Sequence, residues 1–187
     1  SRDFQAYLSP VPTEEMRDYT KPGNWFAKAT DTSQVSSVVK FYNMTIPRLG
    51  IKNAVVSVGG EDLSDSLIQY PGTALPGKLG NAVVFGHSVL PSFYDPRDYL
   101  TIFSTLPTMK KQDEIKVEYD GISYQYRVQE MFEVDPTDLE VLSQNTTSSY
   151  VTLVTCVPPG DPRRPRRLIV RAKLVPPEER SISYLSP

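Results

Sequence analysis

The chain has 187 residues, of which 39% are hydrophobic and 22% charged, so it is long enough to bury a core as one globular domain with appendages. Its formal net charge of -2 at pH 7 provides no positive field for a nucleic-acid backbone, which argues against nucleic acid as a partner. The 17 prolines and 11 tyrosines favour short strands broken by turns over long helices.

The N-terminal residues 1–40 lack apolar periodicity and are rich in proline, serine and threonine, so we expect an extended arm. Within this arm Tyr19, Trp25 and Phe26 would expose a sizeable apolar surface if they stayed in water. We therefore expect part of the arm to dock on the domain and to restrict access to its site.

Strand-like segments begin after the arm. Residues 41–47 form a candidate strand that ends at a proline, and residues 51–58 form the next one. A short helix is expected over residues 62–69, where leucine and isoleucine keep helical spacing. Residues 81–86 are a compact apolar strand, and the only histidine, His87, follows this strand at once.

The middle of the chain carries a strong hairpin signal. Two alternating strands, residues 114–119 and 122–129, flank Asp120-Gly121, a dipeptide that favours a tight two-residue turn. Shorter elements are expected around this hairpin: helical turns at residues 100–106, a strand at 130–134 and a capped short helix at 135–142.

Two further strands complete the pattern. Residues 150–156 are rich in β-branched side chains and end in the only cysteine, Cys156, at the point where a turn-forming Val-Pro-Pro-Gly begins. Residues 167–175 form the last strand, and residues 177–187 form a C-terminal tail. Seven or eight short strands with few helices predict an all-β domain, either a closed barrel or a sandwich.

The single cysteine and the single histidine each end a buried strand, where a rigid scaffold displays catalytic groups to the loops. We expect Cys156 to be a nucleophile and His87 to be its general acid and base. The thiolate is the reactive form, so a cationic neighbour is needed to lower the pKa of the thiol. The competing interpretation is that Cys156 is only a small buried hydrophobic residue.

Four arginines follow the cysteine strand: Arg163, Arg164, Arg166 and Arg167. Arg167 opens an apolar strand, so its backbone is fixed, and its guanidinium is expected to hold the oxyanion formed when a thiolate attacks an amide. Arg166 is the alternative, because alternation along a strand puts adjacent residues on opposite faces. Arg163 and Arg164 are expected to be solvated loop residues.

Three motifs occur in order along the chain: Gly80-Asn81-Ala82-Val83-Val84-Phe85-Gly86-His87-Ser88, Thr152-Leu153-Val154-Thr155-Cys156 and Arg167-Leu168-Ile169-Val170. Together they resemble the sortase family of cysteine transpeptidases, and the resemblance extends over about residues 41–175. Carried over position by position, the family's nucleophile falls on Cys156, its histidine on His87 and its arginine on Arg167. The neighbouring Thr155 and Ser88 are the expected substrate-binding residues.

The resemblance implies a closed eight-stranded β-barrel with a few short helices over residues 41–176. It also implies that residues 1–40 link this barrel to an N-terminal membrane anchor lying before Ser1, with no other contact to the membrane. The expected activity is cleavage of an LPxTG-like sorting signal of a surface protein, through a thioacyl-enzyme, at the extracellular face of the cell membrane. The acyl group would pass to an amine acceptor, either a peptidoglycan precursor or a pilin lysine, and no metal or cofactor is expected.

Other classes fit the sequence less well. Residues 72–79 differ from a phosphate-binding loop, because Leu79 stands where a serine or threonine must bind the metal and Pro76 removes a backbone donor. One histidine and one cysteine are too few ligands for a zinc site. The remaining alternative is a non-catalytic extracellular β-barrel adhesin or structural module, in which Cys156 and His87 are simply packed.

Overall fold

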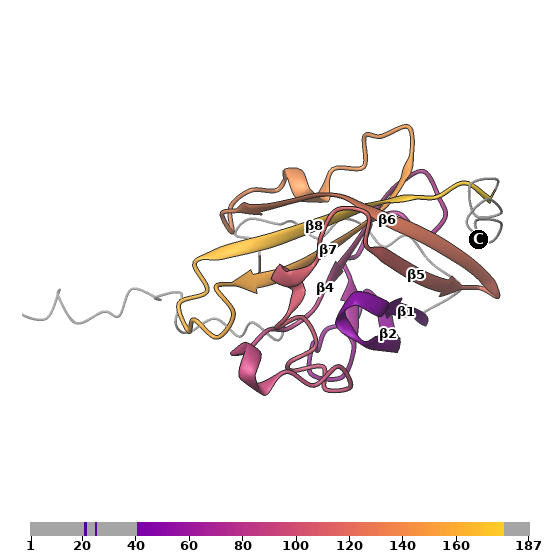
Figure 1. Ribbon diagram of the computed structural model, residues 1–187. Coiled ribbons are helices and arrows are strands. Elements are labelled where there is room, and N and C mark those ends of the chain that lie inside the picture. Colours follow the sequence, from indigo (N-terminus) through magenta and orange to yellow (C-terminus); the bar gives the residue numbers. More distant parts are fainter. Residues whose placement is uncertain (1–20, 22–24, 26–40, 178–187) are drawn as a thin grey trace, which may run out of the picture.

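A computed structural model of the chain describes Lys21, Trp25 and residues 41–177. In residues 41–177 the strands form a closed barrel in the order β1-β2-β3-β4-β7-β8-β6-β5 (Figure 1). These strands are β1 (Phe41–Ile46), β2 (Ile51–Val58), β3 (Leu67–Gln69), β4 (Gly80–Phe85), β5 (Glu114–Tyr119), β6 (Ile122–Val134), β7 (Ser149–Val157) and β8 (Arg166–Leu174). Short 3-10 turns lie between them: η3 (Pro47–Leu49), η4 (Pro91–Phe93), η5 (Leu106–Thr108) and η6 (Glu140–Leu142). The expected all-β, closed eight-stranded barrel with a few short helices is confirmed.

The strands expected from alternation are present with bounds that differ by a residue or two. The hairpin around Asp120-Gly121 is formed by β5 and β6, which pair in antiparallel fashion from Glu114↔Arg127 to Tyr119↔Ile122. β6 continues without a break through the separately expected strand at 130–134, because a bulge between Val128 and Glu130 lets it keep pairing with β8. The expected arm (1–40) and tail (177–187) fall almost entirely outside the described residues.

The helix expected at residues 62–69 is wrong. Residues 62–66 form turns, in which Asp62 Oδ1 accepts hydrogen bonds from the backbone nitrogen and the hydroxyl of Ser64 at 2.8 and 2.7 Å. The chain then enters β3, which pairs with β2 on one side and β4 on the other. All three residues of β3 are buried, so this strand shows no alternation, and its leucine and isoleucine mimic helical spacing.

The capped helix expected at residues 135–142 is reduced to turns that end in η6. The side chain of Asp138 accepts a hydrogen bond from the backbone nitrogen of Glu140 at 3.0 Å, a local turn contact that competes with helix formation. Residues 100–106 likewise form consecutive turns, with Ser104 N donating to Thr101 O, before η5 begins. The local Asp138 contact therefore competes with a continuous helix at residues 135–142, while residues 100–106 form consecutive turns.

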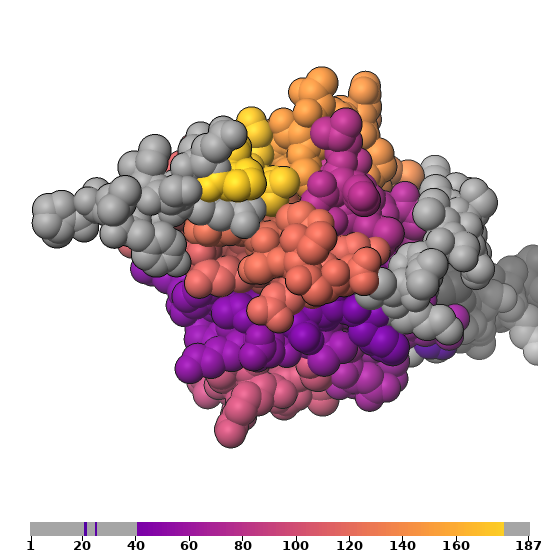
Figure 2. Space-filling view, turned by 90° about the vertical axis from the view of Figure 1, so that its right-hand side faces the viewer, coloured from indigo at the N-terminus to yellow at the C-terminus, as the bar shows by residue number. Residues whose placement is uncertain are grey.

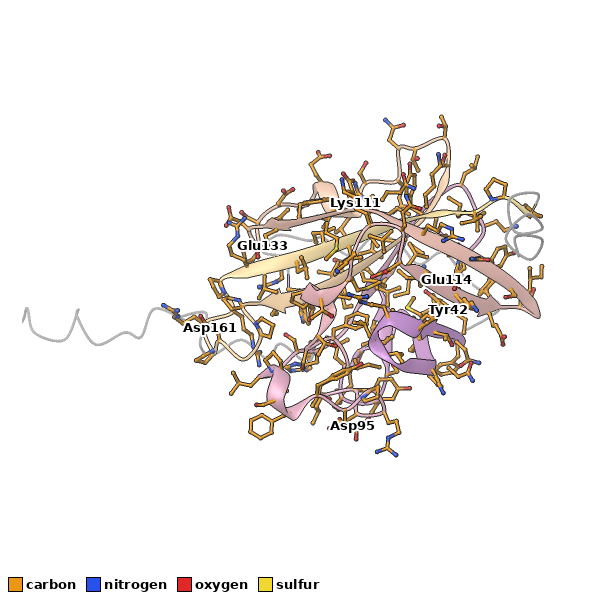
Figure 3. The ribbon with its side chains drawn as sticks, in the orientation of Figure 1. Tyr42, Asp95, Lys111, Glu114, Glu133 and Asp161 are labelled. Atoms are coloured by element: carbon orange, nitrogen blue, oxygen red, sulfur yellow. The ribbon has the colours of Figure 1, made fainter. Side chains whose placement is uncertain are left out.

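The barrel closes where β5 pairs with β1, for example at Asn43↔Glu118. Figure 2 shows the β5–β6 hairpin packed directly against the indigo β1–β2 segment, although the two are far apart in the sequence. An inner core of buried side chains from all eight strands fills the interior. One of these residues is Tyr42, labelled in Figure 3, whose hydroxyl donates to Gln69 Oε1 at 2.8 Å. Because the interior is packed, a substrate site must lie outside the barrel or at one end.

A second apolar cluster lies on the outside of the barrel, and we call it the outer cluster. It consists of Trp25, Leu63, Ile68, Tyr70, Val83, Phe85, Val134, Val141, Val154, Cys156 and Ile169. Alternation along β7 separates the two clusters, since Val151 and Leu153 belong to the inner core while Val154 and Cys156 belong to the outer one. The thiol therefore sits on the outer face of the sheet.

Gly86 follows the last residue of β4 and precedes His87, and the space around it accepts no side chain. A Cβ at this position would lie 2.3 Å from the ring of Phe103, a fully buried member of the inner core. We expect Gly86→Ala to destabilise the fold by about 1–3 kcal/mol through overpacking. Denaturant unfolding measures this loss. Phe103→Leu combined with Gly86→Ala should lose less than the sum of the two single changes, whereas additive losses would place the strain elsewhere.

Candidate active site

The position of His87 relative to Cys156 follows from the pairing of two parallel strands. In the β4–β7 ladder Phe85 lies opposite Val154, which is 69 residues later, and this separation is constant along the ladder. His87 and Cys156 are also 69 residues apart, and each comes two residues after that last pair. The ladder therefore brings the histidine and the thiol to the same end of two neighbouring strands.

Side-chain hydrogen bonds continue this pairing beyond the end of the ladder. Thr155 Oγ1 donates to the carbonyl of Gly86 at 2.8 Å, and Ser88 Oγ donates to the carbonyl of Cys156, also at 2.8 Å. Both hydroxyls are buried. Ser88 and Thr155, the residues expected to bind substrate, thus donate hydrogen bonds to the backbone carbonyls of Cys156 and Gly86. These bonds hold the end of β4 against β7.

The imidazole of His87 is oriented by its own loop. Nδ1 lies 3.1 Å from the carbonyl of Ser88, and since a carbonyl oxygen only accepts, Nδ1 carries the proton in the neutral ring. The backbone carbonyl of His87 in turn accepts from the nitrogen of Phe103 at 3.0 Å. Acid–base exchange therefore falls to Nε2.

Arg167 lies directly opposite Cys156 in the antiparallel β7–β8 ladder. Its side chain is fully buried, with Nε donating to the carbonyl of Trp25 at 3.0 Å. Nη1 donates to the carbonyls of Arg164 and Arg166 at 2.8 and 3.2 Å. Several carbonyl oxygens thus solvate a cation that would be costly to bury without partners.

Arg166, the alternative to Arg167, points to a different part of the surface. Its guanidinium lies 2.8 Å from Asp135 Oδ1 and 3.4 Å from Glu133 Oε2 (Glu133 is labelled in Figure 3), and the side chain is partly exposed. Arg163 pairs with Asp161 at 2.8 Å in the exposed β7–β8 loop. Of the four arginines, Arg167 is the one that faces Cys156 across the ladder.

The electrostatic environment of the thiol combines two opposing effects. Burial raises the pKa of the Cys156 thiol, because the thiolate is poorly solvated there, and the positive charges of Arg167 and then Arg164 lower it. Burial is the larger effect, so the thiol pKa is raised on balance. Cys156 is only 5% exposed. The structure thus shows the thiol in a covered state, in which the protonated form is favoured.

Trp25 covers this site from outside. It is 1% exposed, its ring centroid lies 5.2 Å from that of Phe85, and the guanidinium carbon of Arg167 lies 5.7 Å from the centre of the indole. Docking of an arm aromatic on the barrel, expected from the sequence, is therefore seen for Trp25, while Tyr19 and Phe26 lie outside the described residues. The sequence carries no signal for the Trp25–Arg167 contact, because 142 residues separate the two.

A cavity of about 400 Å³ lies beside the thiol. Its lining includes Cys156, Ser88, Leu90, Phe93 and Asp161, of which Asp161 is labelled in Figure 3 at the β7–β8 loop. A larger cavity of about 590 Å³ lies behind the β6–β7 loop, where Arg171 and Glu130 pair at 3.1 Å, and it does not reach the thiol. We therefore regard the smaller cavity as the one relevant to chemistry.

Two further properties concern the described part of the chain only. Within it no group of three or more His, Cys, Asp or Glu side chains is placed to hold a metal ion. None of its helices has the length and apolar character needed to cross a membrane.

Comparison with protein families gives one match: residues 44–175 match the model of the sortase domain. No curated protein matches the sequence.

Solved structures provide further similarity. A sortase D5 transpeptidase from Clostridium perfringens is 27% identical with a TM-score of 0.63, and the match covers 76% of this chain and 83% of that one. Sortase C-1 from Actinomyces oris is also 27% identical with a TM-score of 0.63, over 74% and 76% of the two chains. A pilus-related sortase C of Group B Streptococcus is 26% identical with a TM-score of 0.64, over 76% and 71%.

The covered state of the thiol predicts how its reactivity depends on pH. Because burial raises the pKa of Cys156, alkylation by iodoacetamide should rise with pH through a midpoint above the ordinary value of a cysteine thiol. Arg167→Gln removes a charge that favours the thiolate, so it should move the midpoint higher still. Arg163→Gln, in the exposed pair with Asp161, should leave it unchanged. Intact-mass measurements across pH give all three midpoints, and a wild-type midpoint below the ordinary value would show that burial does not dominate the thiol pKa.

Proposed function

The chain belongs to the sortase family of cysteine transpeptidases, and from this premise we propose that it cleaves an LPxTG-like sorting signal and transfers the acyl part to an amine acceptor. The observation that carries the proposal is the alignment of three groups at one end of the barrel. Cys156 faces Arg167 across β7–β8, and His87 and Cys156 each come two residues after the last pair of the parallel β4–β7 ladder. A nucleophile, a cation and an acid–base group are what acyl transfer through a thioester requires.

The first half of the proposed reaction forms the thioester. Sγ of Cys156, as the thiolate, attacks the threonyl carbonyl carbon of the donor peptide, and the carbonyl oxygen becomes an oxyanion. The guanidinium of Arg167 stabilises this charge through its planar set of N–H donors. His87, protonated on both nitrogens, gives the Nε2 proton to the glycine nitrogen, the C–N bond breaks, and the C-terminal part of the peptide leaves as an amine.

The second half reverses these roles. A primary amine attacks the thioester carbon, His87 removes one of its protons through Nε2, and the C–S bond breaks to release the thiolate. The product is a new amide, and the enzyme returns to its starting state. No group outside Cys156, His87 and Arg167 has to change its protonation state or its bonding.

The finer points of the proposal concern the partners and the location. We propose that the donor is an LPxTG-like segment of a surface protein, that the acceptor is a peptidoglycan precursor or a pilin lysine, and that the enzyme acts at the extracellular face of the membrane behind an N-terminal anchor. One structural relative is pilus-related, which supports a pilin lysine as a candidate acceptor. The second hypothesis, a packed non-catalytic barrel, is disfavoured by membership of a transpeptidase family.

Incubation with a panel of LPxTG-like peptides tests the proposed function. With one of them the protein should gain the mass of the acyl part, linked to Cys156. Cys156→Ala should form no adduct yet remain folded, and His87→Ala should form it at least about a hundredfold more slowly, on the scale of lost acid–base catalysis. Intact mass and circular dichroism provide the readouts. If Cys156→Ala still turned over peptide, the assignment of the nucleophile would be wrong.

Substitution of the arginines tests the oxyanion assignment. Arg167→Lys keeps the positive charge but loses the planar donor set, so acyl-enzyme formation should slow by about a hundredfold, as for the loss of an oxyanion donor. Arg166→Ala removes partly exposed pairs with Glu133 and Asp135 and should slow the reaction only slightly. The single-turnover rate measures both effects. An inactive Arg166→Ala beside an active Arg167→Lys would reverse the assignment.

A further inference from the structure

In the described part of the chain, the first residues of β4 pair with another strand on one side only. On the side of β3 the ladder is limited to Val84 and Phe85, because β3 is three residues long. The carbonyl of Val83 still accepts a hydrogen bond from the nitrogen of Tyr70 at 2.8 Å, where the chain leaves β3. Two residues earlier, the backbone N–H and C=O of Asn81 point to the same side and need partners from outside the ladder.

The side-chain amide of Gln144, in the β6–β7 loop, supplies these partners. Its Oε1 accepts from the nitrogen of Asn81 at 2.8 Å, and its Nε2 donates to the carbonyl of Asn81, also at 2.8 Å. The same group accepts from the nitrogen of Ala74 at 3.0 Å and donates to the carbonyl of Leu142 at 2.9 Å. These four hydrogen bonds use every donor and acceptor of a carboxamide. Gln144 thus ties the β3–β4 loop, β4 and the β6–β7 loop together.

Two neighbouring residues fit this arrangement. Gly80 has a φ of +120°, and a Cβ at this position would lie 2.7 Å from Oε1 of Gln144, so a glycine leaves the room that the carboxamide needs. The side chain of Asn81 adds a second attachment, since its Nδ2 donates to the carbonyl of Val141 at 3.0 Å and its Oδ1 accepts from Thr152 Oγ1 at 2.6 Å. We call Asn81 and Gln144 the loop clamp.

The loop clamp holds η6 against the surface that carries the thiol. Val141 belongs to the outer cluster together with Cys156, and Leu142 packs against that cluster. The carbonyls of Val141 and Leu142 are the two carbonyls of η6 that the clamp binds. Thr152, the contact of the clamp on β7, comes four residues before Cys156, which is about 13 Å along a strand. At this distance the clamp does not touch the reacting atoms.

Resting on the function proposed above, we propose that Gln144 is a positioning residue for the donor peptide. The donor lies on the outer face of the barrel with its threonyl carbonyl at Cys156, and its apolar residues need an apolar surface that is formed before they arrive. Gln144 forms one side of this surface by fixing Val141 and Leu142 in η6. A loop that is fixed before binding loses less conformational entropy when the peptide binds. Gln144 therefore acts on donor affinity and leaves the bond-making steps at Cys156 unchanged.

Single-turnover kinetics of Gln144 variants test this role. Gln144→Glu keeps the shape of the side chain, but a carboxylate oxygen replaces the NH₂ group and repels the carbonyls of Asn81 and Leu142. In acyl-enzyme formation the half-saturating donor concentration should rise at least about tenfold while the limiting rate stays within about twofold, as when binding alone is lost. Asn145→Asp adds the same charge at the next, exposed position and should change neither value. Alkylation of Cys156 by iodoacetamide should be equally fast in all three proteins.

Hydrogen exchange gives a readout that does not depend on turnover. In Gln144→Ala the amides of Ala74 and Asn81 lose their acceptor and η6 loses one attachment, so residues 74–81 and 139–148 should exchange at least about tenfold faster than in the native protein. The β5–β6 hairpin should exchange at the native rate. Mass spectrometry of peptic fragments measures both regions. If Gln144→Ala does not fold, the same comparison is made for residues 139–148 of Gln144→Glu.

The outcomes separate the role of Gln144 from the reaction itself. If the native protein forms an acyl-enzyme and the Gln144 variants show an unchanged half-saturating donor concentration, the proposal is refuted and the proposed function stands. A slower limiting rate without a change in half-saturation would also refute it, because Gln144 would then act on the reaction step. If no peptide acylates the native protein, the proposed function fails and the role toward a donor fails with it.

Discussion

The parallel pairing of β4 with β7 is the constraint on which the candidate site depends. β4 is buried along its whole length and β7 at every position except Tyr150, so a shift of one residue would exchange the inner-core and outer-cluster side chains and would be strongly disfavoured. Because the register is fixed, His87 and Cys156 end at the same level, and the hydroxyls of Thr155 and Ser88 hold the two strand ends together. The geometry of the site is thus a consequence of core packing.

Two opposing effects act on the pKa of the Cys156 thiol: the nearby positive charge and the burial of the site. The positive charge of Arg167 favours the thiolate of Cys156, but the apolar cover that buries both residues raises the thiol pKa more than the cation lowers it. Removing the indole of Trp25 would admit water to this surface and weaken the effect of burial on the thiol pKa. The same contact that shields the site therefore also keeps the nucleophile in its less reactive form.

The sequence predicts most of the fold, because alternation marks the strands of the hairpin and the apolar runs mark β4 and β7. It fails at residues 62–69, where a three-residue strand buried on both faces shows no alternation, and at 135–142, where turns replace a helix. The apolar residues that follow Arg167 favour it over Arg166, in agreement with the ladder that sets Arg167 opposite Cys156. The contact with Trp25 has no local signal, since it depends on a chain segment that returns from 142 residues away.

In the proposed reaction Cys156 attacks the carbonyl of the donor peptide, and Arg167, which lies opposite Cys156 in the β7–β8 ladder, stabilises the oxyanion. The most direct measurement is a crystal structure of the full chain after reaction with an LPxT peptide whose threonine ends in a thiol-reactive ketone. We expect a bond from the ketone carbon to Sγ of Cys156, with the oxygen within hydrogen-bonding distance of the Arg167 guanidinium. A bound peptide whose oxygen points away from Arg167 would show that the oxyanion role belongs to another donor.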